Sequence, residues 1–82
     1  MKISVEVSLY PLADGYLDII KATVERLAEA EEIAVKTNSM STQLTGEFES
    51  IMKVLQSEIL QTFQNTDKAV FVCKFLNSAI EL

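Results

Sequence analysis

The 82-residue length predicts a single domain spanning residues 1–82, because a chain of this size supplies one hydrophobic core with little area to spare. A composition of 49% hydrophobic residues with only 2 Gly and 1 Pro indicates a compact fold and argues against disorder. The net charge of −5 and the scattered Lys and Arg residues exclude nucleic acid and anionic membrane surfaces as expected partners, because binding phosphates requires a basic stripe.

The first predicted element is a strand. Apolar and polar residues alternate from Ile3 to Tyr10, which is typical of a half-buried strand, and Pro11 is expected to end it. This alternation leaves no continuous apolar segment of the kind found in signal peptides, and no later apolar run approaches membrane-spanning length. The lone Cys73 has no partner for an intrachain disulfide. The chain is therefore expected in the cytoplasm.

A helix is predicted next, from Tyr16 to about Ala30, with Asp14 placed to cap its N-terminus. The acidic run Glu29–Glu32 indicates a solvated helix end and connection. The apolar positions at helical spacing, which should face the core, are Leu17, Ile20, Val24, Leu27 and Ala28.

Two short runs with β-branched residues, Ala34–Thr37 and Thr42–Thr45, predict a β-hairpin whose second strand ends at Gly46. The clearest apolar residues of the two strands, Val35 and Leu44, should face the same core. That requires an even number of loop residues, because a slip of one residue would send one of these side chains to the other face.

We predict a four-residue loop, Asn38–Ser41, closed by Thr37 opposite Thr42. A two-residue loop would require glycine or Asn-Gly at its centre, and Ser39-Met40 offers neither. A four-residue loop leaves backbone N–H groups, hydroxyls and an amide outside the strand ladder. These groups are available to a ligand, or they satisfy the turn locally.

After Gly46 the pattern predicts a second helix with Glu47 and Glu49 in its first turn, where acidic side chains complement the helix dipole. The last strand is expected over Ala69–Leu76 and is apolar on both faces. The core stripe of the second helix is expected to contain Phe48, Ile51, Met52, Leu55, Ile59 and Phe63.

This order of elements, βαββαβ, predicts an α+β ferredoxin-like sandwich, a four-stranded antiparallel sheet with two helices on one face. Glu6 and Lys74 should form a cross-strand pair on the open face. Because three apolar side chains also lie there, we expect this face to pack on another copy, giving a homodimer or higher homo-oligomer. The residues expected on the open face are Ser4, Glu6, Ser8, Tyr10, Gln43, Thr45, Val70, Val72 and Lys74.

Catalysis is not expected. The chain has no His, the commonest general base and metal ligand. Cys73 lies in an apolar strand, where it resembles a small buried hydrophobe more than a nucleophile. No phosphate-binding loop, dinucleotide fingerprint or zinc-ligand spacing occurs. We therefore expect neither a metal site nor a cofactor, and a protein that is not an enzyme.

Three segments carry a family resemblance: Ile3–Leu12, Asn38–Thr42 and Gly46–Met52. In their order and spacing the chain resembles the YkoF-like thiamine/hydroxymethylpyrimidine-binding family and, more distantly, the small ferredoxin-like thiamine-binding proteins. The resemblance implies non-catalytic ligand binding in vitamin salvage or transport. The protein that gives the family its name joins two such domains in one chain, so the same arrangement here would require a homodimer.

The topology groups the matching residues at one end of the sheet, because the first and second strands run in the same direction. Polar groups of the loop could pair with the edge of an aminopyrimidine, Tyr10 could stack on its ring, and Met40 is an adaptable apolar contact. Glu6 could lie near a cationic thiazolium, whereas Glu47 belongs to the opposite end. The expected ligand-binding residues are Glu6, Ser8, Tyr10, Asn38, Ser39, Met40, Ser41 and Thr42.

Other functions stay open at this point. The main alternative is a regulatory or scaffold module that oligomerises through its open sheet face and binds a protein or another metabolite. A hydrolase is a third reading. Phosphorylated thiamine is a poorer expected ligand because its phosphate would meet net negative charge, although the positive N-terminal end of the first helix lies at the same end of the sheet.

Overall fold

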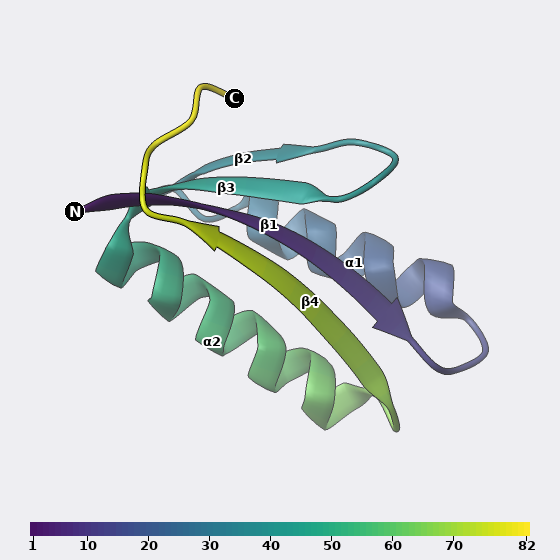
Figure 1. The fold of residues 1–82 in the computed structure, drawn as a ribbon. Coiled ribbons are helices and arrows are strands. Elements are labelled where there is room, and N and C mark those ends of the chain that lie inside the picture. Colours follow the sequence, from purple (N-terminus) through teal and green to yellow (C-terminus); the bar gives the residue numbers. More distant parts are fainter.

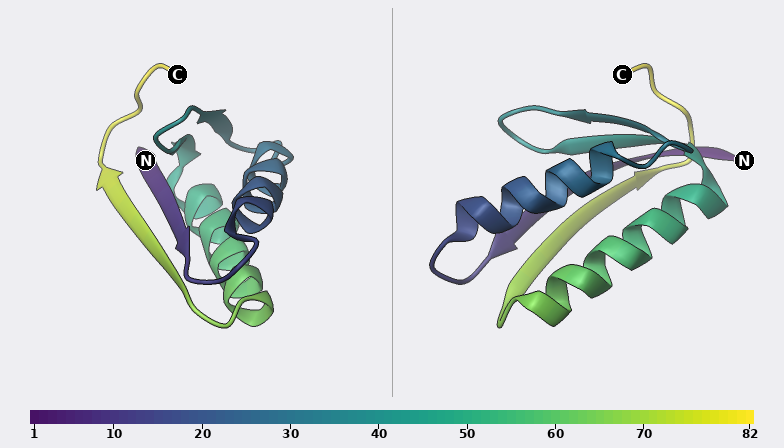
Figure 2. Two further views of the ribbon diagram at one scale, coloured as in Figure 1. Left: turned by 90° about the vertical axis from the view of Figure 1, so that its right-hand side faces the viewer. Right: turned by 180° about the vertical axis from the view of Figure 1, so that it is seen from behind.

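The computed structural model describes residues 1–82 as a four-stranded antiparallel sheet with two helices packed on one of its faces (Figures 1 and 2). The strand order is β2-β3-β1-β4, so β1 and β3 are central while β2 and β4 form the edges. The predicted ferredoxin-like α+β fold is confirmed. In chain order the elements are β1 (Lys2–Pro11), α1 (Tyr16–Ala28), β2 (Ala34–Thr37), β3 (Thr42–Glu47), α2 (Phe48–Asn65) and β4 (Ala69–Leu76).

The β2–β3 hairpin has the predicted register. Val35 pairs with Leu44 and Thr37 pairs with Thr42, which leaves four residues in the loop. Leu44 is fully buried, and Val35 on the edge strand packs against the same core. The parity of the two strands therefore determined the loop length, as expected from the alternation of side chains along a strand.

The core lies between the sheet and the helices. It is built from the inward-facing side chains of β1 and β3, from the residue before β2, and from one face of each helix. The alternation along β1 predicted its share of this layer directly, because every second side chain of a strand points to the same face. The buried apolar residues are Ile3, Val5, Val7, Leu27, Ile33, Leu44, Ile51 and Leu55.

Several predicted boundaries are wrong by one or two residues. β1 continues through Pro11, which pairs with Ala69. A proline is tolerated there because its missing N–H would point to the side where no strand continues. β3 continues through Gly46 and Glu47, so α2 begins only at Phe48 and Glu47 is its N-cap residue. The first helix, α1, ends at Ala28 rather than at about Ala30.

The start of α1 is also different from the prediction. Its N-cap residue is Gly15 rather than Asp14, and no side chain makes a capping hydrogen bond. Gly15 has φ 74°, in the left-handed region that glycine adopts without steric cost. The chain therefore enters α1 through the left-handed conformation of Gly15, and the Asp14 side chain does not cap the helix.

Periodicity identified both helices but misplaced part of their buried faces. The expected core positions Leu17 and Ala28 of α1 are exposed, and Thr23 is buried instead. On α2 the buried positions are Ile51, Leu55, Glu58 and Thr62. Three residues of the expected core stripe of α2 are exposed, by 41% at Phe48, 39% at Met52 and 50% at Phe63.

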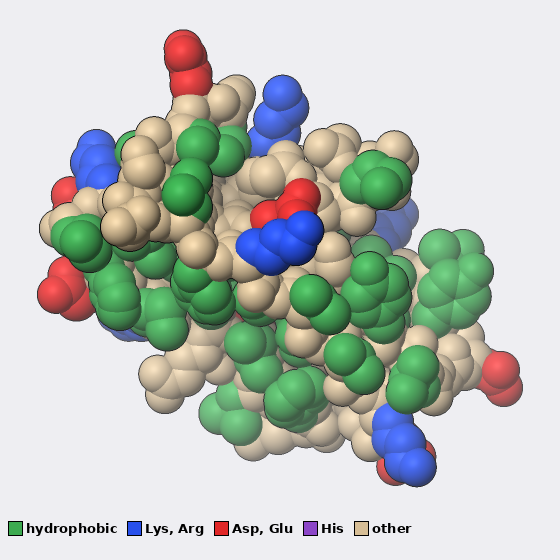
Figure 3. Space-filling model, viewed as in Figure 1, with side chains coloured by type: hydrophobic (Ala, Val, Ile, Leu, Met, Phe, Trp, Pro, Cys, Tyr) green, Lys and Arg blue, Asp and Glu red, His purple; other side chains and the backbone are tan.

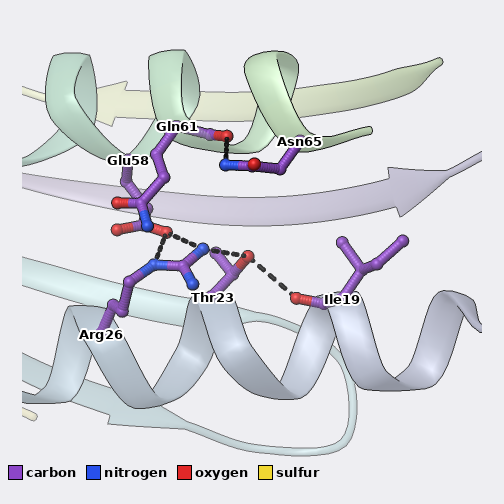
Figure 4. A network of polar contacts seen from close by, with 6 residues as sticks. All are labelled: Ile19, Thr23, Arg26, Glu58, Gln61 and Asn65. Carbon is purple, nitrogen blue, oxygen red and sulfur yellow. Dashed lines mark hydrogen bonds and ion pairs between the residues drawn. The ribbon is translucent and has the colours of Figure 1, made fainter. Parts of the chain in front are cut away.

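The physical reason is a polar layer between the helices, shown in Figure 4. Arg26 Nε donates to Glu58 Oε1 at 2.7 Å, and Arg26 Nη2 lies 2.6 Å from the same oxygen. Thr23 Oγ1 accepts a longer bond from Arg26 Nη2 and donates to the Ile19 carbonyl. The Glu58 side chain is only 9% exposed, so its charge depends on Arg26 for compensation.

Replacing Arg26 with methionine is expected to lower the free energy of unfolding by about 2–3 kcal/mol, because the buried Glu58 carboxylate loses its cation. The loss is smaller than for a fully buried pair, since one third of the Arg26 side chain is exposed. Urea denaturation measures the change. The double variant Arg26→Met/Glu58→Leu should recover most of the stability. A double variant no more stable than Arg26→Met would contradict this account.

The face of the sheet away from the helices is only partly open. Glu6 and Lys74 form the predicted cross-strand pair, with Oε1 and Nζ 3.5 Å apart. The segment after β4 crosses this face near the start of β1 (Figure 1). Ser4 Oγ donates to the Ser78 carbonyl at 2.7 Å and accepts from the Ile80 N–H at 2.9 Å. Ser4 was expected on an open surface, yet it is buried under this segment.

Candidate functional site

A hollow of about 520 Å³ lies between α1 and the sheet, at the end of β1. It exists because the strands of the sheet are staggered. β3 starts opposite Val7, so Ser8–Pro11 have β4 on one side and no strand on the other. The N-terminal half of α1 and the Asn38–Ser41 loop enclose the resulting notch.

Seven of the eight predicted ligand-binding residues line this hollow: Ser8, Tyr10, Asn38, Ser39, Met40, Ser41 and Thr42. The end of the first strand and the hairpin loop therefore meet, as the parallel direction of β1 and β2 predicted. Glu6 does not line the hollow. Its Oε2 accepts from Ser41 Oγ at 2.9 Å, so Glu6 supports the loop from the open face of the sheet.

The loop uses much of its own hydrogen-bonding capacity. The Asn38 N–H donates to the Ser41 carbonyl at 3.0 Å. Asn38 Oδ1 accepts from the backbone N–H groups of Met40 and Ser41, at 2.8 and 3.1 Å. Thr37 and Thr42 join their hydroxyls at 2.9 Å. Of the two roles left open for Asn38, holding the turn locally is the one its carbonyl oxygen performs.

Replacing Asn38 with alanine is therefore expected to lower the free energy of unfolding by about 1–2 kcal/mol, because two backbone N–H groups of the loop lose their acceptor. Asn38→Asp keeps an acceptor at this position and should lose less. Thermal or urea denaturation of the two variants checks the difference. Equal stabilities of Asn38→Ala and the parent chain would show that the loop does not depend on this side chain.

Strand alternation separates the side chains at the end of β1. Ser8 and Tyr10 point to the face opposite Leu9, where they pair with Val72 and Val70. Ser8 and Tyr10 therefore line the hollow mainly with atoms at the edge of the strand. A second aromatic ring, Tyr16 at the start of α1, also lines the hollow and is half exposed.

The backbone of Leu9 faces the notch without a partner. The bond from the Leu12 N–H to the Lys68 carbonyl continues the β1–β4 ladder, so alternation directs the Leu9 N–H and C=O away from β4. β3 has ended on that side, and no other backbone bond reaches Leu9. The notch therefore presents one free donor and one free acceptor next to each other.

Sequence reasoning missed the α1 wall of the hollow. Its residues recur at i, i+4, i+7, i+8 and i+11, a helical stripe that starts one residue before the expected one. The available signal in the sequence was Thr23, a polar residue within this otherwise apolar stripe. The structure shows that Thr23 is buried. The α1 residues that line the hollow are Tyr16, Ile20, Thr23, Val24 and Leu27.

No charged residue lines the hollow, and nine of its 17 lining residues are hydrophobic. Such a surface suits a flat, weakly polar ring better than a phosphate.

A smaller hollow of about 310 Å³ between the helices holds none of the predicted ligand-binding residues. Cys73 packs against the core, where burial raises the pKa of its thiol and so favours the neutral form. Neither helix is long and apolar enough to span a membrane.

Comparisons with known proteins give one family and several similar structures. The family model of the YKOF-related family matches residues 2–78. A protein from Streptococcus pneumoniae has a similar structure, with a TM-score of 0.86 and 24% identity over 98% of this chain and 90% of that chain. A protein from Thermotoga maritima, provisionally assigned to thiamine biosynthesis or salvage, has a TM-score of 0.85 and 17% identity over 100% of this chain and 91% of that chain. None of the curated proteins matches significantly.

Proposed function

Because this chain belongs to the YKOF-related family, we propose that it binds thiamine or its hydroxymethylpyrimidine moiety, without catalysis, in the hollow at the end of β1. The observation that carries the proposal is the unpaired Leu9 backbone at the edge of an uncharged hollow. We place the protein in vitamin salvage or transport in the cytoplasm. The thiamine-related assignment of the Thermotoga maritima neighbour supports that context.

The chemistry of an aminopyrimidine fits this edge. Its amino group is a donor and the adjacent ring nitrogen is an acceptor. The Leu9 C=O and N–H offer the complementary pair, in the way one strand recognises another. The ring would then lie beside Tyr16, whose aromatic face suits stacking, and near the flexible side chain of Met40. Ser39, which makes no side-chain hydrogen bond within the chain, is free to bind a substituent.

The positive thiazolium of thiamine would favour a nearby carboxylate. Glu6 is the nearest candidate in the hydrogen-bond network, one step behind Ser41. Glu6 also contacts Lys74, which offsets part of its charge. We therefore expect the pyrimidine to supply most of the affinity and the thiazolium to add a smaller share. Thiamine phosphates should bind less well, because no basic residue lines the hollow.

Self-association is part of the proposal. On the open face of the sheet, Tyr10, Val70 and Val72 remain 54%, 45% and 47% exposed. A second copy covering them would remove this apolar surface from water. Near the start of β1, this face is covered by the segment around Ser78 and Ile80. The contact between the two copies is therefore expected on the β4 side.

Calorimetric titration with hydroxymethylpyrimidine, thiamine and thiamine phosphate tests the function. We expect the first two to bind and the phosphate to bind more weakly. Each true ligand should also raise the melting temperature, because it binds only the folded chain. Absence of both heat and a melting shift with hydroxymethylpyrimidine and thiamine would contradict the proposal.

A further inference from the structure

The smaller hollow, of about 310 Å³, lies between the two helices and differs in chemistry from the hollow at the end of β1. Its walls come from the middle of α1 and the C-terminal end of α2, and only two of its seven lining residues are hydrophobic. On the sheet side of the molecule, by contrast, hydrophobic side chains gather over β4 and α2 (Figure 3). The residues that line the smaller hollow are Ile19, Ala22, Arg26, Gln61, Thr62, Asn65 and Thr66.

Thr62 carries the one buried side-chain polar atom of this chain that has no hydrogen-bond partner. The residue is 2% exposed, and its Oγ1 makes no bond. A threonine inside a helix can satisfy its hydroxyl on the carbonyl four residues earlier, and Thr23 does so on Ile19 at 3.0 Å. Thr62 makes no such bond to the Glu58 carbonyl. Because an unpaired buried hydroxyl is unfavourable, we expect its partner to be a group that enters the hollow.

Other polar groups around the hollow are also unused. Arg26 bonds to Glu58 and Thr23 through Nε and Nη2, so its Nη1 makes no bond within the chain. Figure 4 shows Gln61 and Asn65 on α2, across from Arg26 on α1. Asn65 Nδ2 donates to the Gln61 backbone carbonyl at 2.8 Å, which leaves Asn65 Oδ1 and the Gln61 side-chain amide without a bond. The hollow therefore offers donors and acceptors together.

The charges around the hollow favour an uncharged ligand. Arg26 is the only charged residue in the lining, and Glu58 compensates its charge. The last turn of α2 contains no basic residue, so the partial negative charge of the helix C-terminus is not offset. An anion would meet this partial charge and the Glu58 carboxylate, whereas a cation would meet the Arg26 guanidinium. A neutral molecule avoids both.

We propose that the hollow between α1 and α2 binds a small uncharged polyhydroxyl compound, of the class of polyols and monosaccharides. Each hydroxyl of such a compound both donates and accepts, so it matches Thr62 and Arg26 Nη1 as well as the amide oxygens. Ile19 and Ala22 supply an apolar surface for its C–H groups. The volume holds about ten water-sized groups, which is enough for a monosaccharide. This site goes beyond the proposed function and does not depend on it.

NMR titration of the labelled full chain with glucose, myo-inositol and sorbitol, each up to tens of millimolar, tests the site. We expect saturable shifts with at least one of them at the Thr62 and Thr66 amides and at Arg26 Nε–H. Thr62→Val keeps the shape of the side chain and removes its hydroxyl, so it should weaken this binding about 10-fold. Ser57→Ala removes a hydroxyl from the same helix outside the hollow and should leave the affinity unchanged.

A second measurement uses the chain without any added compound. Thr62→Val should raise the melting temperature by about 4–8 °C, because a methyl group replaces a buried hydroxyl that has no partner. Thr23→Val is the control and should lower the melting temperature, since the Thr23 hydroxyl makes two bonds. A lower melting temperature for Thr62→Val would overturn the proposal. So would the absence of saturable shifts with all three compounds, or equal affinities of Thr62→Val and the parent chain.

Discussion

Replacing Val24 with tryptophan is expected to weaken hydroxymethylpyrimidine binding about 100-fold or more, equivalent to roughly 2.7 kcal/mol, while the chain remains folded. Val24 lines the hollow from α1 and is only partly buried. It is not among the residues packed against the main core. The tryptophan ring would therefore occupy the space of the ligand and should disturb the core little. Calorimetric titration measures the affinity, and circular dichroism measures the folding.

Leu17→Trp is the matched control for this experiment. Leu17 lies on the same helix, is 66% exposed and does not line the hollow. The same increase in side-chain size at this position should leave the affinity unchanged. If Val24→Trp binds as tightly as Leu17→Trp, the ligand does not occupy the hollow beside α1. A loss of binding in both variants would indicate a general effect of the added ring.

Replacing Leu44 with alanine is expected to lower the free energy of unfolding by about 3–5 kcal/mol. Leu44 is fully buried at the centre of β3, between Val5 on β1 and Val35 on β2. The helices cover this side of the sheet, so little can move to fill the cavity. A domain of this size has a total stability of about 4–12 kcal/mol, so this one substitution should remove a large share of it.

Urea denaturation of Leu44→Ala and Val35→Ala checks the prediction. Val35 packs against the same core from the edge strand and is only partly buried, so its truncation should cost about 1 kcal/mol. The comparison matters because both residues have the same parity in the hairpin. Equal losses at the two positions would show that Leu44 is not at the centre of the core.

The outline of the site followed from strand direction and parity, whereas its inner wall did not. Residues at the end of the first strand and in the hairpin loop were predicted to meet because parallel strands end at the same edge of a sheet, and seven of them line one hollow. Local patterns do not report how far β3 reaches along β1. The unpaired Leu9 backbone depends on that stagger, and the hollow it faces is lined by Tyr16 from α1.

Alternation and periodicity in the sequence by themselves determined the order of elements, the hairpin register and the sheet topology, because a backbone can bury an apolar face in few ways. Only the tertiary structure decided how far the buried face of each helix extends around its axis. The pair of Arg26 with Glu58 places charge between α1 and α2 and leaves Phe48, Met52 and Phe63 exposed. Such a pairing joins residues 32 positions apart, so no local pattern contains it.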